Sequence, residues 1–143
     1  FQFVFTDVPY WDMEIAPRSK GAFKRVGEPA IPRRPTRLHA HNDLRYPSKQ
    51  AWLDAMKTIF TSAVALLDRD RYLAAFIGDM YLKGCYHCLS AELAEVLSTI
   101  PGLVWKANLV WYDVAKALHL YGYQYAYIPS MVHQNILVFR KEC

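Results

Sequence analysis

The sequence predicts an α/β fold with mainly parallel strands and a C-terminal antiparallel hairpin. Apolar runs that suit buried strands alternate with amphipathic stretches that suit helices, which is the pattern of parallel strands joined by helical crossovers. Two further strand candidates close the chain around a Pro-Ser turn. The 143 residues are 53% hydrophobic and 21% charged, so we expect a single domain with a substantial core.

The first predicted strand and the first predicted helix are separated by a long segment. The apolar run at residues 1–6 predicts a buried strand that stops at Asp7. Ser48 is a suitable N-cap, and apolar residues recur after it every three or four positions, which predicts an amphipathic helix of about 20 residues. The segment at about 14–46 contains four prolines, which disfavour a helix or a central strand. We expect this segment to be a loop.

The second half of the chain supplies the other predicted elements. The apolar run at 71–79 ends in Gly-Asp and predicts a second buried strand. Ser90 is expected to cap a shorter helix, which the Pro-Gly pair at 101–102 stops. The remaining predicted strands are 103–112, 121–128 and 131–139, of which the last two would pair around Pro129 and Ser130.

The positive charge of the chain is concentrated in the predicted loop. The whole chain has a net charge of +4, whereas residues 15–45 alone hold eight Lys or Arg against two acids. We expect a cationic flap that contacts nucleic-acid phosphates, where neutralisation releases counterions. A solvated basic loop without a partner is the alternative. The residues expected to contact nucleic acid are Lys24, Arg25, Arg33, Arg34 and Arg37.

Polar and aromatic residues follow the first strand, in the order Asp7, Val8, Pro9 and Tyr10. In open α/β sheets, ligands bind at the carboxyl ends of strands. An acid accepts a hydrogen bond from an amino group, proline stiffens the turn, and an aromatic ring can stack on a planar base. The segment therefore predicts a site for an exocyclic amino group of a nucleobase.

The tetrapeptide 7–10 resembles the (D/N/S)PPY catalytic motif of the amino-methyltransferases that modify adenine or cytosine in DNA. Val8 stands where this family usually has proline, but valine also offers a backbone carbonyl. The run at 71–79 is similar to the family's next strand, and the tail at 121–141, which includes His133, is similar to its closing hairpin. The resemblance covers nearly the whole chain outside the loop and implies part of a Rossmann-like methyltransferase sheet.

The resemblance also implies a reaction, in which a methyl group passes from S-adenosylmethionine to the amino group of a base flipped out of DNA. Asp7 and the Val8 carbonyl would accept the two amino hydrogens. Catalysis would rest on positioning and electrostatics, without a covalent nucleophile. The residues implied in the site are Asp7, Val8, Pro9 and Tyr10 as the catalytic motif, and Tyr10, Trp11 and Asp12 for stacking on the base or lining the cofactor site.

The Gly-rich turn that holds the cofactor in this family, usually Phe-x-Gly-x-Gly, has no counterpart here. The chain has six glycines, and none falls in a Gly-x-Gly pattern. We therefore expect a catalytic half-domain that works with a complementary cofactor-binding segment or with a second copy of the chain. Two alternatives stay open: a catalytically incomplete nucleic-acid-binding fragment of this fold, or a methyltransferase that acts on RNA or on a protein.

Other candidate sites are expected to be structural. Cys85 and Cys88 form a Cys-x-x-Cys, and His39 and His41 have metal-like spacing, but zinc requires additional ligands, so we expect no metal. Asp79 either orients the cofactor or base, or caps a turn. The chain has no apolar run of about 18 residues and no recognisable secretory signal, so we expect a cytoplasmic protein without a membrane span.

Overall fold

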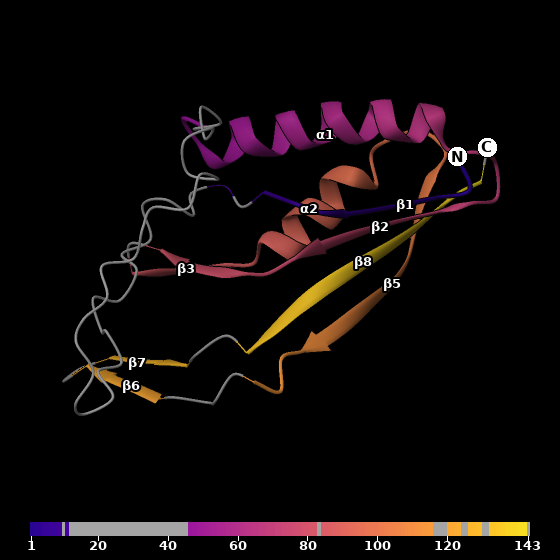
Figure 1. Cartoon of the computed structure of the whole chain (residues 1–143). Coiled ribbons are helices and arrows are strands. Elements are labelled where there is room, and N and C mark those ends of the chain that lie inside the picture. The colour runs from indigo at the N-terminus through magenta and orange to yellow at the C-terminus, as the bar shows by residue number, and fades with distance from the viewer. Residues whose placement is uncertain are drawn as a thin grey trace, which may run out of the picture.

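The computed structural model describes residues 1–9, 11, 46–82, 84–115, 120–123, 126–129 and 132–142. Strands and helices alternate through the first part of this fold (Figure 1). In chain order the elements are β1 (Phe3–Asp7), α1 (Lys49–Leu66), β2 (Tyr72–Ile77), β3 (Met80–Leu82), β4 (Cys85–His87), α2 (Leu89–Leu97), β5 (Leu103–Tyr112), β6 (Leu120–Tyr123), β7 (Ala126–Pro129) and β8 (His133–Lys141).

The main sheet has four strands in the order β1-β2-β8-β5. β1 and β2 are parallel, whereas β8 lies between β2 and β5 and is antiparallel to both (Figure 1). The prediction of α/β architecture is confirmed, but the sheet is partly parallel rather than mainly parallel. The difference arises because β8 returns against the direction of the other three strands, so only one of the three pairings in this sheet is parallel.

The predicted hairpin between 121–128 and 131–139 is wrong. β7 pairs with β6 in a separate two-stranded sheet, and β8 pairs with β2 and β5 instead. Only two residues separate β6 from β7. Bringing these two strands together therefore costs little chain entropy. β8 alternates buried and half-buried residues, and the buried Leu137 and Phe139 belong to the main core.

The first helix begins as the sequence predicted, directly after Ser48. Ser48 is the N-cap of α1, and its hydroxyl accepts a hydrogen bond from the Ala51 N–H at 3.1 Å. The start of α2 differs from the prediction, because Cys88 rather than Ser90 is the N-cap and Ser90 lies within the first turn. Two short strands, β3 and β4, were not predicted as a pair; they form a hairpin in which Gly84 has a φ of +82°.

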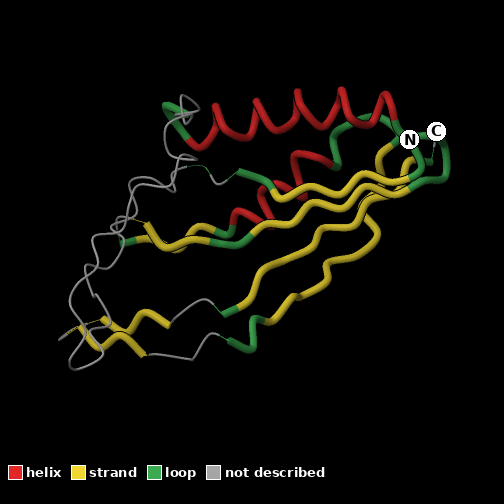
Figure 2. The backbone as a smooth tube through the Cα atoms, viewed as in Figure 1, coloured by secondary structure: helices red, strands yellow, loops and turns green. Residues whose placement is uncertain are grey.

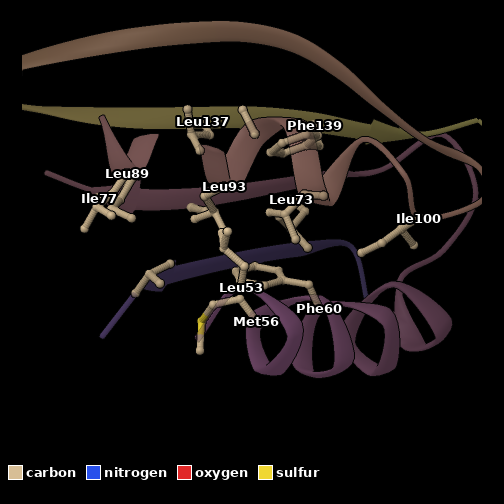
Figure 3. Packing of buried hydrophobic residues seen from close by; sticks show 14 of the residues in the cluster. Leu53, Met56, Phe60, Leu73, Ile77, Leu89, Leu93, Ile100, Leu137 and Phe139 are labelled. Atoms are coloured by element: carbon tan, nitrogen blue, oxygen red, sulfur yellow. The ribbon is translucent and has the colours of Figure 1, made fainter. Parts of the chain in front are cut away.

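Both helices pack against one face of the sheet. Buried side chains of α1 and α2 share a single hydrophobic cluster with alternate residues of β2 and β8. Figure 3 shows Met56 and Phe60 of α1 and Leu93 of α2 in this cluster, together with Leu73 and Phe139 from the strands. The backbone trace in Figure 2 shows α1 running along the strands. The helices therefore hold the strands, and with them the strand ends, in fixed positions.

Candidate active site at the carboxyl end of β1

The parallel pairing of β1 and β2 places two strand ends at one edge of the sheet. Asp7 is in register with Phe76, and the Val8 N–H donates a hydrogen bond to the Phe76 carbonyl at 3.0 Å. The turn after β1 therefore lies beside Gly78 and Asp79, which follow β2. This edge corresponds to the usual ligand position in open α/β sheets.

Asp7 and Val8 point in opposite directions at this edge, as successive strand residues do. Asp7 is exposed to solvent, whereas Val8, backbone included, is 2% exposed and belongs to the hydrophobic core. The buried valine anchors the turn, and the acid next to it remains accessible to a ligand.

The backbone carbonyls of Val8 and Pro9 have different environments. The Pro9 carbonyl accepts a hydrogen bond at 2.8 Å from the indole Nε1–H of Trp52, a fully buried residue of α1. No described residue donates a hydrogen bond to the Val8 carbonyl. Trp52 therefore fixes the turn through Pro9, the residue next to Val8.

Trp52 is one of the apolar residues that recur after Ser48, and the sequence pattern gives no link between it and the turn after β1. A buried indole N–H usually has a hydrogen-bond acceptor. A buried tryptophan therefore predicts that an acceptor exists, but it does not predict which residue provides it. The partner is 43 residues away in the sequence.

Trp11 packs against the hairpin formed by β3 and β4. Its ring meets the His87 ring edge to face, with centroids 5.3 Å apart and an interplanar angle of 77°. Trp11 is half-buried and also packs against the hydrophobic core. Several residues named in the sequence analysis lie outside the residues that the structure describes. They are Tyr10, Asp12, Lys24, Arg25, Arg33, Arg34 and Arg37 of the predicted site, and His39 and His41, which have metal-like spacing.

Asp79 joins this hairpin to the N-terminus of α2. Its carboxylate accepts hydrogen bonds from the Tyr86 hydroxyl at 2.8 Å and from the Ser90 N–H at 2.9 Å, and the Cys88 thiol lies 3.6 Å away. A carboxylate at a helix N-terminus satisfies an otherwise unpaired N–H and interacts favourably with the helix dipole. Of the two roles considered for Asp79, the contacts support capping.

The contact with Asp79 also affects the ionisation of Tyr86. Burial raises the pKa of the Tyr86 phenol above its ordinary value, and the hydrogen bond and negative charge of Asp79 raise it further. Tyr86 therefore remains a neutral hydrogen-bond donor at physiological pH. The hairpin next to the strand end is held by this donor and by the Trp11–His87 contact.

The other candidate sites that the structure describes are Cys85, Cys88 and His133. Cys85 and Cys88 are free, exposed thiols. Within the described residues, no group of three or more His, Cys, Asp or Glu could hold a metal ion. His133 is exposed at the start of β8. None of the helices in these parts of the chain is both long and apolar enough to cross a membrane.

Comparison with known proteins gave matches among solved structures alone. No family model matches the chain, and no curated protein matches it significantly. Two crystal structures of TTHA0409 from Thermus thermophilus, named a "putative DNA modification methylase", match 99% of the chain at 17% identity, with TM-scores of 0.60 and 0.62. A third, complexed with S-adenosyl-L-methionine, matches 66% of the chain at 19% identity with a TM-score of 0.54.

The chain has a fold similar to that of the Thermus methylase. It spans less than half of that protein, since the matches cover 45%, 46% and 38% of the Thermus chain. At 17–19% identity the likeness establishes the fold and leaves the reaction to be argued from the site.

Proposed function

We propose that this chain is the catalytic half of an S-adenosylmethionine-dependent DNA methyltransferase that modifies the exocyclic amino group of adenine or cytosine. The observation that carries the proposal is the construction of the turn after β1. Asp7 is exposed, and the Val8 carbonyl has no donor among the described residues. The buried Trp52 indole fixes the turn by donating a hydrogen bond to the Pro9 carbonyl. The proposal therefore rests on an exposed carboxylate and a backbone carbonyl without a described donor, in consecutive residues at the edge where open α/β sheets bind ligands.

Two adjacent acceptors suit an NH2 group, which has two hydrogens to donate. The Asp7 carboxylate accepts one amino hydrogen and the Val8 carbonyl accepts the other, so the amino group is held in a fixed orientation. Its nitrogen lone pair is then directed away from the acceptors, toward the side from which an electrophilic carbon approaches. Holding the group in this way lowers the barrier by orientation and by electrostatic preorganisation.

Among the described residues, we find no turn that would by itself hold the cofactor. The described glycines of positive φ are Gly84, in the hairpin, and Gly102, in the turn between α2 and β5, and neither belongs to a Gly-x-Gly turn. A close approach of backbone to ligand requires such glycines. The chain therefore contributes the acceptors for the amino group, and the methyl donor is held by a different segment.

Substitution of Asp7 tests the proposal. In the complete enzyme, Asp7→Ala is expected to abolish methylation of DNA because the variant loses one acceptor. Asp7→Asn is the matched control, since its side-chain oxygen still accepts a hydrogen bond and it should retain measurable activity. Methyl transfer is followed with isotopically labelled S-adenosylmethionine, and circular dichroism verifies the fold. Full activity of Asp7→Ala would remove Asp7 from the mechanism.

The missing Gly-rich turn supports a second candidate, a catalytically incomplete fragment that binds nucleic acid. Calorimetry distinguishes the catalytic half-enzyme from the incomplete nucleic-acid-binding fragment. The chain alone is titrated with S-adenosylmethionine and, separately, with duplex DNA. Under the half-enzyme proposal, cofactor binding appears once the complementary segment is added. DNA binding without methylation in the presence of that segment would favour the fragment. RNA and protein substrates are assayed in parallel to define the substrate class.

A further inference from the structure

Trp11 makes a ring contact with the hairpin of β3 and β4. Its indole meets the His87 ring at a centroid distance of 5.3 Å and an interplanar angle of 77°. Both values lie in the range that aromatic pairs prefer, because the positive edge of one ring then faces the negative face of the other. Trp11 is half-buried and is therefore not closed off from a ligand.

The hairpin stands next to the turn that carries Asp7. β3 begins three residues after β2 ends, and in Figure 1 it continues from β2 past the end of β1. Trp11 is two residues from Pro9, whose carbonyl Trp52 fixes, so the Cα atoms of residues 9 and 11 are at most about 7 Å apart. The contact between Trp11 and His87 therefore joins the turn after β1 to an element that follows β2.

The backbone at His87 is fixed on both sides. Before it, the Tyr86 hydroxyl donates a hydrogen bond to the Asp79 carboxylate at 2.8 Å. After it, α2 begins at Leu89, which is fully buried in the core. Across the hairpin, His87 is in register with Met80, another buried core residue. These contacts fix the position of His87 without any contribution from Trp11.

The His87 imidazole has no polar role in the described part of the chain. It makes no hydrogen bond or ion pair with another described residue, and it belongs to no group of His, Cys, Asp or Glu there that could hold a metal ion. The edge-to-face contact with Trp11 is therefore the specific interaction that this ring supplies among these residues.

We propose that His87 is a positioning residue that holds the Trp11 indole in place as a stacking wall for the base whose amino group Asp7 accepts, a role that rests on the proposed function. A flipped base gains binding free energy by stacking on an aromatic ring. This gain is larger when the ring is already ordered, because no side-chain entropy is then lost on binding. His87 acts through Trp11 and touches no reacting atom.

Steady-state methylation by the complete enzyme tests this role. In His87→Ala the indole loses its contact, and KM for duplex DNA should rise about 3- to 10-fold, the range that one aromatic pair supplies. The kcat and KM for S-adenosylmethionine should not change, because stacking stabilises the bound base equally in the ground state and the transition state. Partial unfolding would instead lower kcat and leave both KM values unchanged.

Three further variants separate the ring contact from other changes in β4. His87→Phe keeps an aromatic ring against Trp11 and should restore KM for DNA to within about twofold of the wild-type value. Cys85→Ala is the matched control and should leave KM unchanged, because Cys85 is an exposed free thiol on the same strand, two residues from His87. In a Trp11→Ala background, His87→Ala should raise KM no further, because residues that act as a unit are not additive.

Fluorine NMR of protein labelled with fluorotryptophan reports the contact without catalysis. The Trp11 resonance, identified by its absence in Trp11→Phe, should shift in His87→Ala and not in Cys85→Ala. The inference is overturned by an unchanged KM for DNA in active His87→Ala enzyme, by a rise in KM for S-adenosylmethionine instead, or by additive effects in the Trp11→Ala background. Absence of methylation by the wild-type enzyme would overturn the proposed function, and with it the role in base binding, even where the fluorine shift confirms the contact.

Discussion

The Trp52–Pro9 hydrogen bond is expected to hold the turn after β1, and Trp52→Phe removes it while keeping an aromatic ring in the core. The bond is 2.8 Å long and the indole is fully buried. Its loss costs about 0.5–1.5 kcal/mol, the net worth of one hydrogen bond. The further penalty for a buried unsatisfied acceptor does not apply, because Pro9 is exposed and water can reach its carbonyl. The volume lost with the indole adds about 1 kcal/mol. We expect a loss of about 2 kcal/mol in the free energy of unfolding.

Urea unfolding followed by far-ultraviolet circular dichroism measures this change. Trp105→Phe is the matched control. Its indole Nε1–H also donates to a backbone carbonyl, that of Ala107 at 3.0 Å, but the Trp105 side chain is 45% exposed and the bond lies in an exposed part of β5. The control should lose less than about 1 kcal/mol, in the range of ordinary surface substitutions.

The consequence for the site is measured by hydrogen exchange at the Val8 amide. Loosening of Pro9 should speed this exchange in Trp52→Phe and leave it unchanged in Trp105→Phe, because the Val8 N–H closes the last hydrogen bond between β1 and β2. Methylation by the complete enzyme should fall in the first variant alone. Equal destabilisation of the two variants, with unchanged exchange at Val8, would refute the role given to Trp52.

Two further predictions concern the basic segment at residues 15–45 and the hairpin of β3 and β4. Combined replacement of Arg33, Arg34 and Arg37 by Ala should weaken DNA binding and reduce the slope of log affinity against log salt by about 1 for each phosphate that is no longer neutralised. Fluorescence anisotropy over a salt series measures this, and an unchanged slope would show that the loop does not contact phosphate. Asp79→Asn should lower the pKa of Tyr86 part of the way to its ordinary value, because the negative charge is removed while burial persists. Alkaline titration of tyrosinate absorbance checks this; an unchanged pKa would mean that burial alone sets it.

The elements that could be predicted from the sequence are those set by local patterns. The helix after Ser48 shows three- and four-residue periodicity and a capping side chain, and the strands at β1, β2 and β5 are apolar runs. The α2 cap was misplaced because Asp79, eleven residues from Ser90, supplies the acceptor from outside the helix. A cap provided by another element leaves no sequence pattern at the helix start.

The pairing of β8 is the clearest case of a non-local choice. Its alternating residues suit either side of a hairpin, and the sequence gives no reason to place it between β2 and β5. The decision comes from burial, because Leu137 and Phe139 become fully buried against the helices only in the main sheet. Such choices depend on tertiary packing, which overrides local strand signals. The position of Asp7 at the end of β1 was predictable because Asp7 directly follows an apolar run, and its role as an acceptor stays a prediction.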